Sequence, residues 1–69
     1  MLIKKSITLK RHRTSLSLEK EFWEALELIA KNKNSSLQEL ISQIDIKRRS
    51  SLASSTRVYI LENLGKINL

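Results

Sequence analysis

Three polar side chains at alternating positions, Arg13, Ser15 and Ser17, are the residues of this sequence best suited to recognising another molecule. They alternate with Leu16 and Leu18, and alternation at period two is typical of a half-buried strand. If the leucines pack on a core, the three polar side chains point away from it. Arginine can bond guanine O6 and N7 together, and serine can read donor or acceptor edges of bases. We therefore predict contacts to DNA bases; the alternative is a face that is only solvated.

Positive charge is concentrated around these residues. The chain has 13 Lys and Arg against 7 Asp and Glu, a formal net charge of +6 and a sequence pI near 10.1. This balance on a small domain indicates a polyanionic partner. No acidic residue precedes Glu19. Four basic side chains in this segment are predicted to contact DNA phosphates, with strong salt dependence: Lys4, Lys5, Lys10 and Arg11.

The start of a helix at Ser36 is a second predicted phosphate site. Ser36 and Glu39 have the spacing of a capping box. The free N–H groups and the dipole of a helix N-terminus suit a phosphate oxygen. The candidates are Ser35, Ser36 and the backbone N–H of Leu37. Ordinary helix capping is the alternative explanation of this pattern.

The spacing of apolar and capping residues predicts the elements that must position these groups. The fold class is mainly α with one short strand, in a single domain over residues 1–69. In chain order, we expect a basic arm over 1–9, a strand over 11–18, and helices over 19–33, 36–48 and 52–64. Gly65 stands where the last helix should end.

A single strand needs a partner for its backbone groups. The apolar residues of Ile7-Thr8-Leu9 have the opposite parity to Leu16 and Leu18, so one regular strand cannot bury both sets on one side. Either a bulge intervenes near Lys10 and Arg11, or residues 1–9 are a separate arm. No second strand is evident, so the strand is predicted to pair with its copy in a homodimer.

Dimerisation also suits the size of the chain, because 69 residues without cysteine leave few other means of stabilisation.

The sequence places Trp23 at the flank of the apolar face of the first helix. The predicted dimer core consists of Leu16, Leu18, Phe22, Leu26, Ile29, Leu37, Leu40, Ile41 and Ile44.

Several other classes of protein fit the sequence poorly. It has no cysteine, a single histidine at position 12 and no glycine-rich phosphate loop, so we expect no enzyme activity, no metal site and no cofactor. No apolar run approaches the roughly 18 residues that span a bilayer, so we expect no membrane partner and a cytoplasmic location.

The chain resembles the ribbon-helix-helix family, which is common in bacterial genomes. The resemblance covers about residues 5–64, and the stretch HRTSLSLE followed by EFWEAL is its most specific part. Weaker support comes from SSL at 35–37, from the short hydrophobic helix ending in ID at 44–45, and from LASSTRVYILE at 52–62.

This resemblance implies a dimeric transcriptional repressor or the DNA-binding half of an antitoxin. It also implies that Arg13, Ser15 and Ser17 face the bases and that residues 35–37 hold a phosphate. The chain departs from the family pattern in having a third helix, and in having serine at two strand positions where many relatives have longer polar side chains.

A protein-interaction module is the alternative function. The predicted last helix carries four consecutive apolar residues, Val58-Tyr59-Ile60-Leu61, so apolar groups point in several directions. Such a helix is either buried in the dimer or presents a surface to a protein partner, as in an antitoxin or an adaptor. Neutralising Arg13 discriminates the two, because it should abolish DNA binding and leave partner binding intact. The alternative to a single dimer on DNA is the assembly of several dimers on neighbouring sites.

Overall fold

The computed structural model describes residues 1–65, which form two strands and three helices. The elements are β1 (Leu2–Leu9), β2 (His12–Glu19), α1 (Lys20–Asn32), α2 (Leu37–Lys47) and α3 (Leu52–Leu64). The helices agree with the predicted ranges to within one residue at each end. Residues 66–69 of the predicted 1–69 domain lie outside the described residues.

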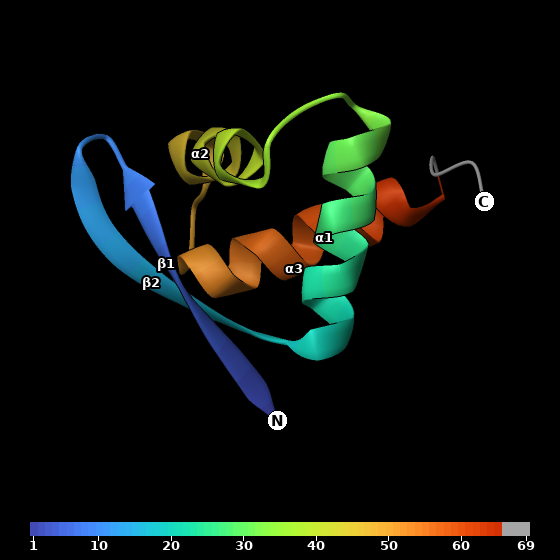
Figure 1. Ribbon diagram of the computed structural model, residues 1–69, viewed down its shortest axis with the longest axis horizontal. Coiled ribbons are helices and arrows are strands. Elements are labelled where there is room, and N and C mark those ends of the chain that lie inside the picture. Colours follow the sequence, from blue (N-terminus) through green and yellow to red (C-terminus); the bar gives the residue numbers. More distant parts are fainter. Residues whose placement is uncertain (66–69) are drawn as a thin grey trace.

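The two strands form an antiparallel hairpin within one chain (Figure 1). The register runs from the pair Leu2 and Glu19 to the pair Leu9 and His12. Only Lys10 and Arg11 lie between the strands, with φ of 48° and 69°. Positive φ at both central residues is the signature of a type I′ turn, whose twist matches that of the flanking strands.

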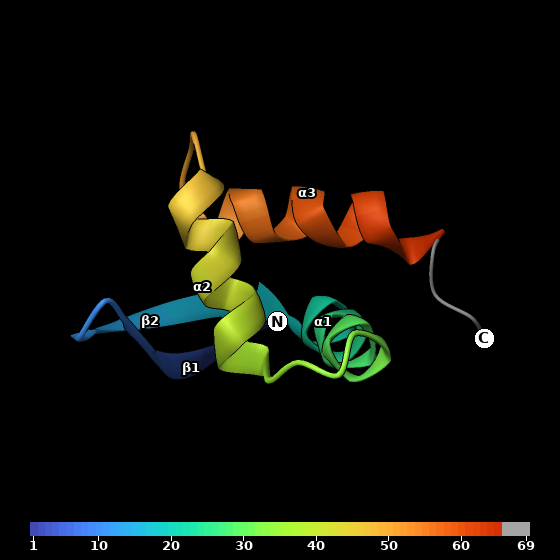
Figure 2. The same cartoon turned by 90° about the horizontal axis from the view of Figure 1, so that it is seen from above.

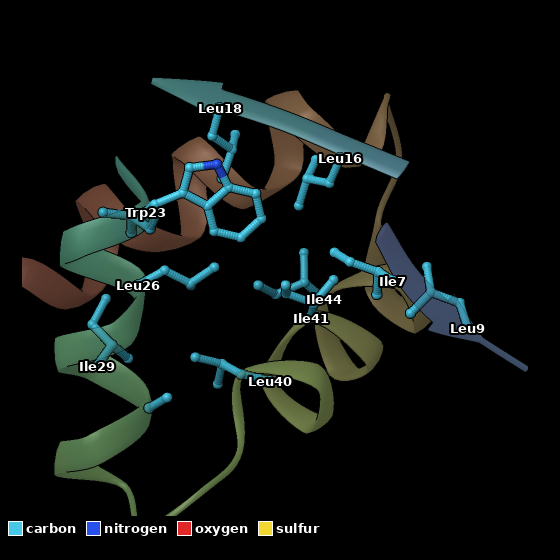
Figure 3. Packing of buried hydrophobic residues seen from close by; sticks show 12 residues of the cluster. Ile7, Leu9, Leu16, Leu18, Trp23, Leu26, Ile29, Leu40, Ile41 and Ile44 are labelled. Atoms are coloured by element: carbon cyan, nitrogen blue, oxygen red, sulfur yellow. The ribbon is translucent and has the colours of Figure 1, made fainter. Parts of the chain in front are cut away.

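The predictions of a single strand and of a basic arm over residues 1–9 are therefore wrong, since β2 has its partner in its own chain. The two-residue turn also explains the change of parity. Ile7 pairs with Thr14, and directly paired residues of an antiparallel ribbon lie on the same face. Ile7 and Leu9 therefore join Leu16 and Leu18 on the face that packs on the helices, as Figure 3 shows.

The connection between α1 and α2 has the cap that asparagine favours. Asn34 adopts a φ of 53°. Its N–H donates to Lys31 O at 3.1 Å, and the N–H of Ser35 donates to Ala30 O at 2.9 Å. This is the Schellman pattern of helix termination. Asparagine tolerates this left-handed conformation better than most other residues.

All three helices pack on the inner face of the hairpin. Helix α2 packs against β1 and α3 against β2, whereas α1 contacts β2 and, through Trp23, also β1. Figure 2 shows the first turn of α2 beside β1 and its last turn directed away from the hairpin. The buried apolar side chains form one core: Ile7, Leu9, Leu16, Leu18, Trp23, Leu26, Ile29, Ala30, Leu40, Ile41, Ile44 and Ile60.

Trp23 lies inside this core, and the assignment of Trp23 to the flank of α1 was wrong. Its side chain is 3% exposed, whereas Phe22 is only partly buried. The indole Nε1–H donates to the Ile3 carbonyl oxygen of β1 at 2.8 Å. A buried indole usually requires such a partner. The sequence could not reveal this acceptor, because it belongs to a strand that the sequence did not predict.

Replacing Trp23 with Phe is expected to lower the free energy of unfolding by about 1–2 kcal/mol, because the variant lacks the hydrogen bond to Ile3 and part of the packing. Urea titration followed by circular dichroism measures this change. Tyr59→Phe is the control, since the Tyr59 hydroxyl makes no hydrogen bond with the described part of the chain. Equal stability of the two variants would contradict the role of the indole N–H.

Helix α3 closes the other side of the core with a face that includes two polar residues. Thr56 and Asn63 are buried. Their side chains donate to the helix backbone, Thr56 Oγ1 to Leu52 O at 2.7 Å and Asn63 Nδ2 to Tyr59 O at 2.8 Å. These bonds satisfy the polar atoms without any partner outside the helix.

An ion pair joins α3 to the end of β2. Arg57 Nε donates to Glu19 Oε1 at 3.1 Å, and the guanidinium lies 5.9 Å from the centre of the Phe22 ring. The backbone N–H of Glu19 and then the Arg57 guanidinium lower the pKa of the Glu19 carboxyl. Glu19 is the last residue of β2 and the N-cap of α1, so it precedes the first turn of the helix.

Candidate nucleic-acid interface

The face of the hairpin turned away from the helices is entirely polar between its two ends. In β2, Arg13, Ser15 and Ser17 alternate with the inward leucines, and only Ser17 is partly covered. These are the three side chains predicted to contact bases. The inner-face packing in Figure 3 explains their direction, because successive side chains of a strand point to opposite faces.

Strand β1 contributes three further side chains to this outer face. The register pairs Lys4 with Ser17, Ser6 with Ser15 and Thr8 with Arg13. Lys4, Ser6 and Thr8 are all exposed. Sequence reasoning included Lys4 as a phosphate contact but missed Ser6 and Thr8, although their alternation with Ile7 and Leu9 was the available signal. The outer face is thus a two-by-three array of polar residues from a single chain.

The predicted phosphate contacts are divided between the two faces and the turn. Lys4 lies on the outer face, and Lys10 and Arg11 form the exposed tip of the hairpin. Lys5 lies on the inner side, where its Nζ is 3.5 Å from Glu27 Oε1 and 4.8 Å from the centre of the Trp23 ring. Its charge is therefore engaged within the chain.

The hairpin tip is the most basic part of this surface. Lys10, Arg11 and Arg13 lie there with His12, and all four are exposed. A left-handed conformation is unfavourable for residues other than glycine, asparagine or aspartate, yet both turn residues are basic. Strained backbone of this kind is concentrated at functional sites in proteins.

The second predicted phosphate site lies at the start of α2, beside β1. Leu37 and Gln38 line a shallow depression together with Lys5 and Ser6. The predicted capping box is confirmed, because Ser36 Oγ accepts from the Glu39 N–H and the Ser36 N–H donates to Glu39 Oε1, both at 3.1 Å. The Glu39 carboxylate thus occupies part of the position where a phosphate would bind.

Ser36→Ala is expected to raise the pKa of Glu39 toward its ordinary value near 4.5. In the folded chain, the Ser36 backbone N–H and then its hydroxyl lower that pKa. A lowered folded-state pKa stabilises the fold above the unfolded-state pKa, and this stabilisation is lost as pH falls through the folded-state value. The variant should therefore lose less stability on acidification.

An NMR titration of the Glu39 carboxyl carbon, together with urea titrations between pH 5 and pH 3, measures both effects. Ser51→Ala is the matched control, because Ser51 caps α3 by accepting from the Ser54 N–H at 3.1 Å and has no carboxylate partner. If Glu39 has the same pKa in the two variants, the Ser36 hydroxyl does not contribute to lowering that pKa.

The basic residues at the end of α2 are remote from the ribbon face. Figure 2 shows this end of α2 on the side away from the hairpin, and an 11-residue helix is about 16 Å long. Arg48 Nε donates to Asp45 Oδ1 at 2.8 Å. The Lys47-Arg48-Arg49 cluster therefore does not extend the outer face of the hairpin.

Two further features of residues 1–65 concern metal binding and membrane insertion. Within this range no three His, Cys, Asp or Glu side chains come together as metal ligands. No helix in the same range has the length and apolar character needed to cross a membrane.

The chain matches a known protein family. The family model described as a ribbon-helix-helix domain matches residues 2–64, which includes both strands and all three helices. No curated protein and no solved structure matches the chain. Proteins of this family are generally DNA-binding transcription regulators and are typically dimers. Because the match covers nearly the whole chain, this protein belongs to the ribbon-helix-helix family.

Proposed function

We propose that this protein is a transcriptional repressor or autoregulator that inserts its β-hairpin into the major groove of DNA. The observation that carries the proposal is the polar outer face, on which Arg13 and the two serines of β2 point away from a core formed by the other face. A two-stranded ribbon fits the major groove, and arginine there reads guanine. Membership of the ribbon-helix-helix family is independent support for this proposal.

The charge around this face supports the same proposal. Lys4 on the outer face and Lys10 and Arg11 at the tip lie where phosphates would flank an inserted ribbon. The N-terminus of α2 is a further proposed phosphate contact through the N–H groups of Leu37 and Gln38, which have no acceptor within the helix. The Ser35 and Ser36 hydroxyls would assist by fixing this turn.

Arg13→Ala is expected to lower the affinity for the preferred DNA fragment by about 10- to 100-fold, because a bidentate contact to guanine contributes about 1–3 kcal/mol. Fluorescence anisotropy on genomic fragments around the protein's own gene, at two salt concentrations, measures it. Arg49→Ala is the matched control, since it removes the same charge from an exposed position in the loop after α2.

The pattern of affinities decides the outcome. Saturable binding to one fragment that is abolished in Arg13→Ala and kept in Arg49→Ala supports sequence reading by the ribbon. Weak binding to every fragment that disappears at higher salt, equally in all three proteins, would overturn the proposal. A basic domain with a protein partner would then be the better description.

Homodimerisation in the cytoplasm is part of the proposal. Family members are typically dimers, and α3 leaves Val58 and Leu61 51% and 63% exposed on its side opposite the core. The same exposed face favours the alternative function, an antitoxin or adaptor that binds a protein through α3. Sedimentation of the protein with Val58→Ser and Leu61→Ser tests whether a second copy covers this face, and a dimer unchanged by both substitutions would exclude it.

A further inference from the structure

Helices α2 and α3 meet at a steep angle beside the loop that joins them (Figure 2), and a cavity of about 440 Å³ opens between the two helices. The DNA contacts of the proposed function do not involve this cavity. We propose that it binds a small organic anion with an apolar body, such as an aromatic or branched aliphatic carboxylate. Its volume is within the range of about 300–1,000 Å³ that is usual for ligand pockets.

The charged side chains of the cavity are separated along its length. The end of α2 and the following loop contribute three consecutive basic residues, Lys47, Arg48 and Arg49. The acidic residue in the lining is Glu62 of α3. It follows Ser55, in the first turn of α3, by seven residues, which corresponds to about 10 Å along the helix. An anion is therefore favoured at the end beside the loop.

Arg48 is held in place at this positive end. Its Nε donates to Asp45 Oδ1 at 2.8 Å, and its Nη1 donates to the Ser50 carbonyl oxygen at 2.9 Å. A guanidinium has five N–H donors, so most of them remain available after these two bonds. The Asp45 carboxylate offsets the charge of Arg48. Lys47 and Arg49 are exposed and form no ion pair within residues 1–65, so their charges can favour a bound anion.

Two hydroxyl groups add a hydrogen-bond donor to the same end of the cavity. Ser50 Oγ and Ser55 Oγ lie 3.2 Å apart and share a hydrogen bond. Each hydroxyl has one hydrogen, and the bond between them uses only one of the two. The second O–H can therefore donate to a carboxylate oxygen. A hydrogen bond to a charged group is stronger than one between neutral groups.

The part of the cavity between the loop and Glu62 is apolar. The buried Ile44 and the partly buried Tyr59 line it together with Val58, which is exposed. An apolar ligand body would remove this surface from water, and an inorganic anion would not. The cavity therefore favours an organic anion over phosphate or sulfate.

Benzoate is a suitable probe, and benzamide is its matched neutral analogue. In amide NMR titrations of the natural protein, benzoate should shift signals of residues 43–50 and 55–62, which include the lining of the cavity. We expect a dissociation constant of about 1–10 mM for so small a probe. Benzamide, which lacks the charge, and acetate, which lacks the ring, should bind at least about fivefold more weakly. Equal affinity for benzoate and benzamide would overturn the proposal.

Arg49→Gln tests the charge at the loop end. It should weaken benzoate binding by about two- to fivefold, because one exposed charge near the anion is lost. Arg11→Gln is the matched control, since it removes the same charge from the exposed tip of the hairpin. An equal loss in both variants would show that benzoate responds only to the net charge of the chain, which would contradict the proposed position of the anion.

Val58→Asp tests the apolar part of the cavity. It should lower the affinity for benzoate by at least about tenfold, because aspartate removes an apolar contact and repels the anion. Leu61→Asp is the matched control, since Leu61 is exposed on the same helix but does not line the cavity. If both variants lose binding equally, benzoate contacts the exposed face of α3 outside the cavity, and the proposal is wrong.

These outcomes are independent of the proposed function. Benzoate binding with the expected pattern among the variants supports the ligand site even if the protein shows no preference for any DNA fragment. Conversely, the ribbon can read DNA in a protein whose cavity is covered by a second copy. The absence of shifts in residues 43–50 and 55–62 up to about 50 mM benzoate would overturn the ligand site and leave the proposed function intact.

Discussion

Replacing the turn Lys10-Arg11 with Asn-Gly is expected to stabilise the hairpin and weaken DNA binding at the same time. Both turn residues have positive φ, a conformation that costs most L-residues about 1–2 kcal/mol. Asn-Gly is the preferred sequence of a type I′ turn. We expect the free energy of unfolding to rise by about 1–2 kcal/mol in total, because the larger backbone entropy that glycine loses on folding offsets part of the relieved strain.

The expected decrease in affinity follows from the two charges that the substitution removes. Each lysine or arginine that neutralises a phosphate contributes about 0.9 to the slope of log affinity against log salt. At about 0.15 M salt, removing two such charges reduces the affinity about 30-fold and lowers the slope by about 1.8. Urea titration and fluorescence anisotropy at several salt concentrations measure the two quantities on the same protein.

Lys31→Gln with Lys47→Gln is the control for this turn variant. It removes the same net charge from the exposed surfaces of α1 and α2, and lysine and glutamine have similar helix propensities. If the turn variant binds DNA as the control does, the tip makes no phosphate contact. A rise in stability alone would then mean that the basic turn serves some other purpose.

Leu18→Ala is expected to remove most of the stability of the domain. Leu18 is 0% exposed, and its cavity would lie between β2 and the helices. Truncation of a buried leucine to alanine costs about 2–5 kcal/mol, whereas a chain of this size has a total stability of about 3–10 kcal/mol. Urea titration followed by circular dichroism and by the fluorescence of Trp23 measures the loss.

Leu61→Ala provides the matched comparison, because it is the same substitution at a position 63% exposed. Its expected effect is within about 0.5 kcal/mol. A large loss in both variants would show that Leu61 is covered in solution, as a dimer through α3 requires. A small loss in both would contradict the position of Leu18 in the core.

The predictable part of the site is the part that depends on local pattern. Arg13, Ser15 and Ser17 could be assigned to one exposed face because the leucines between them leave a strand no other arrangement. Ser36 and Glu39 could be assigned to a capping box because both bonds form within four residues. Neither assignment needs to know what lies across from the segment.

The features that the sequence did not reveal depend on contacts distant in sequence. The engagement of Lys5 by Glu27 joins residues 22 positions apart. The burial of Trp23 depends on a β1 carbonyl 20 positions away. Helical periodicity places a residue on one side of its own helix, but it does not say how wide the covered side is. The position of β1 decides both the contact of Lys5 with Glu27 and the burial of Trp23.

The sequence by itself determined the local structure of this protein: the alternation of β2, the extents of three helices, the capping box at Ser36 and the side of β2 that stays exposed. These features follow from backbone preferences and from period-two or 3.6-residue patterns. Tertiary structure decided that residues 2–9 are a strand and that β2 pairs within its own chain. The reason is that Lys10 and Arg11 are not residues that favour positive φ, so the turn forms through the burial of Ile7 and Leu9 against the helices.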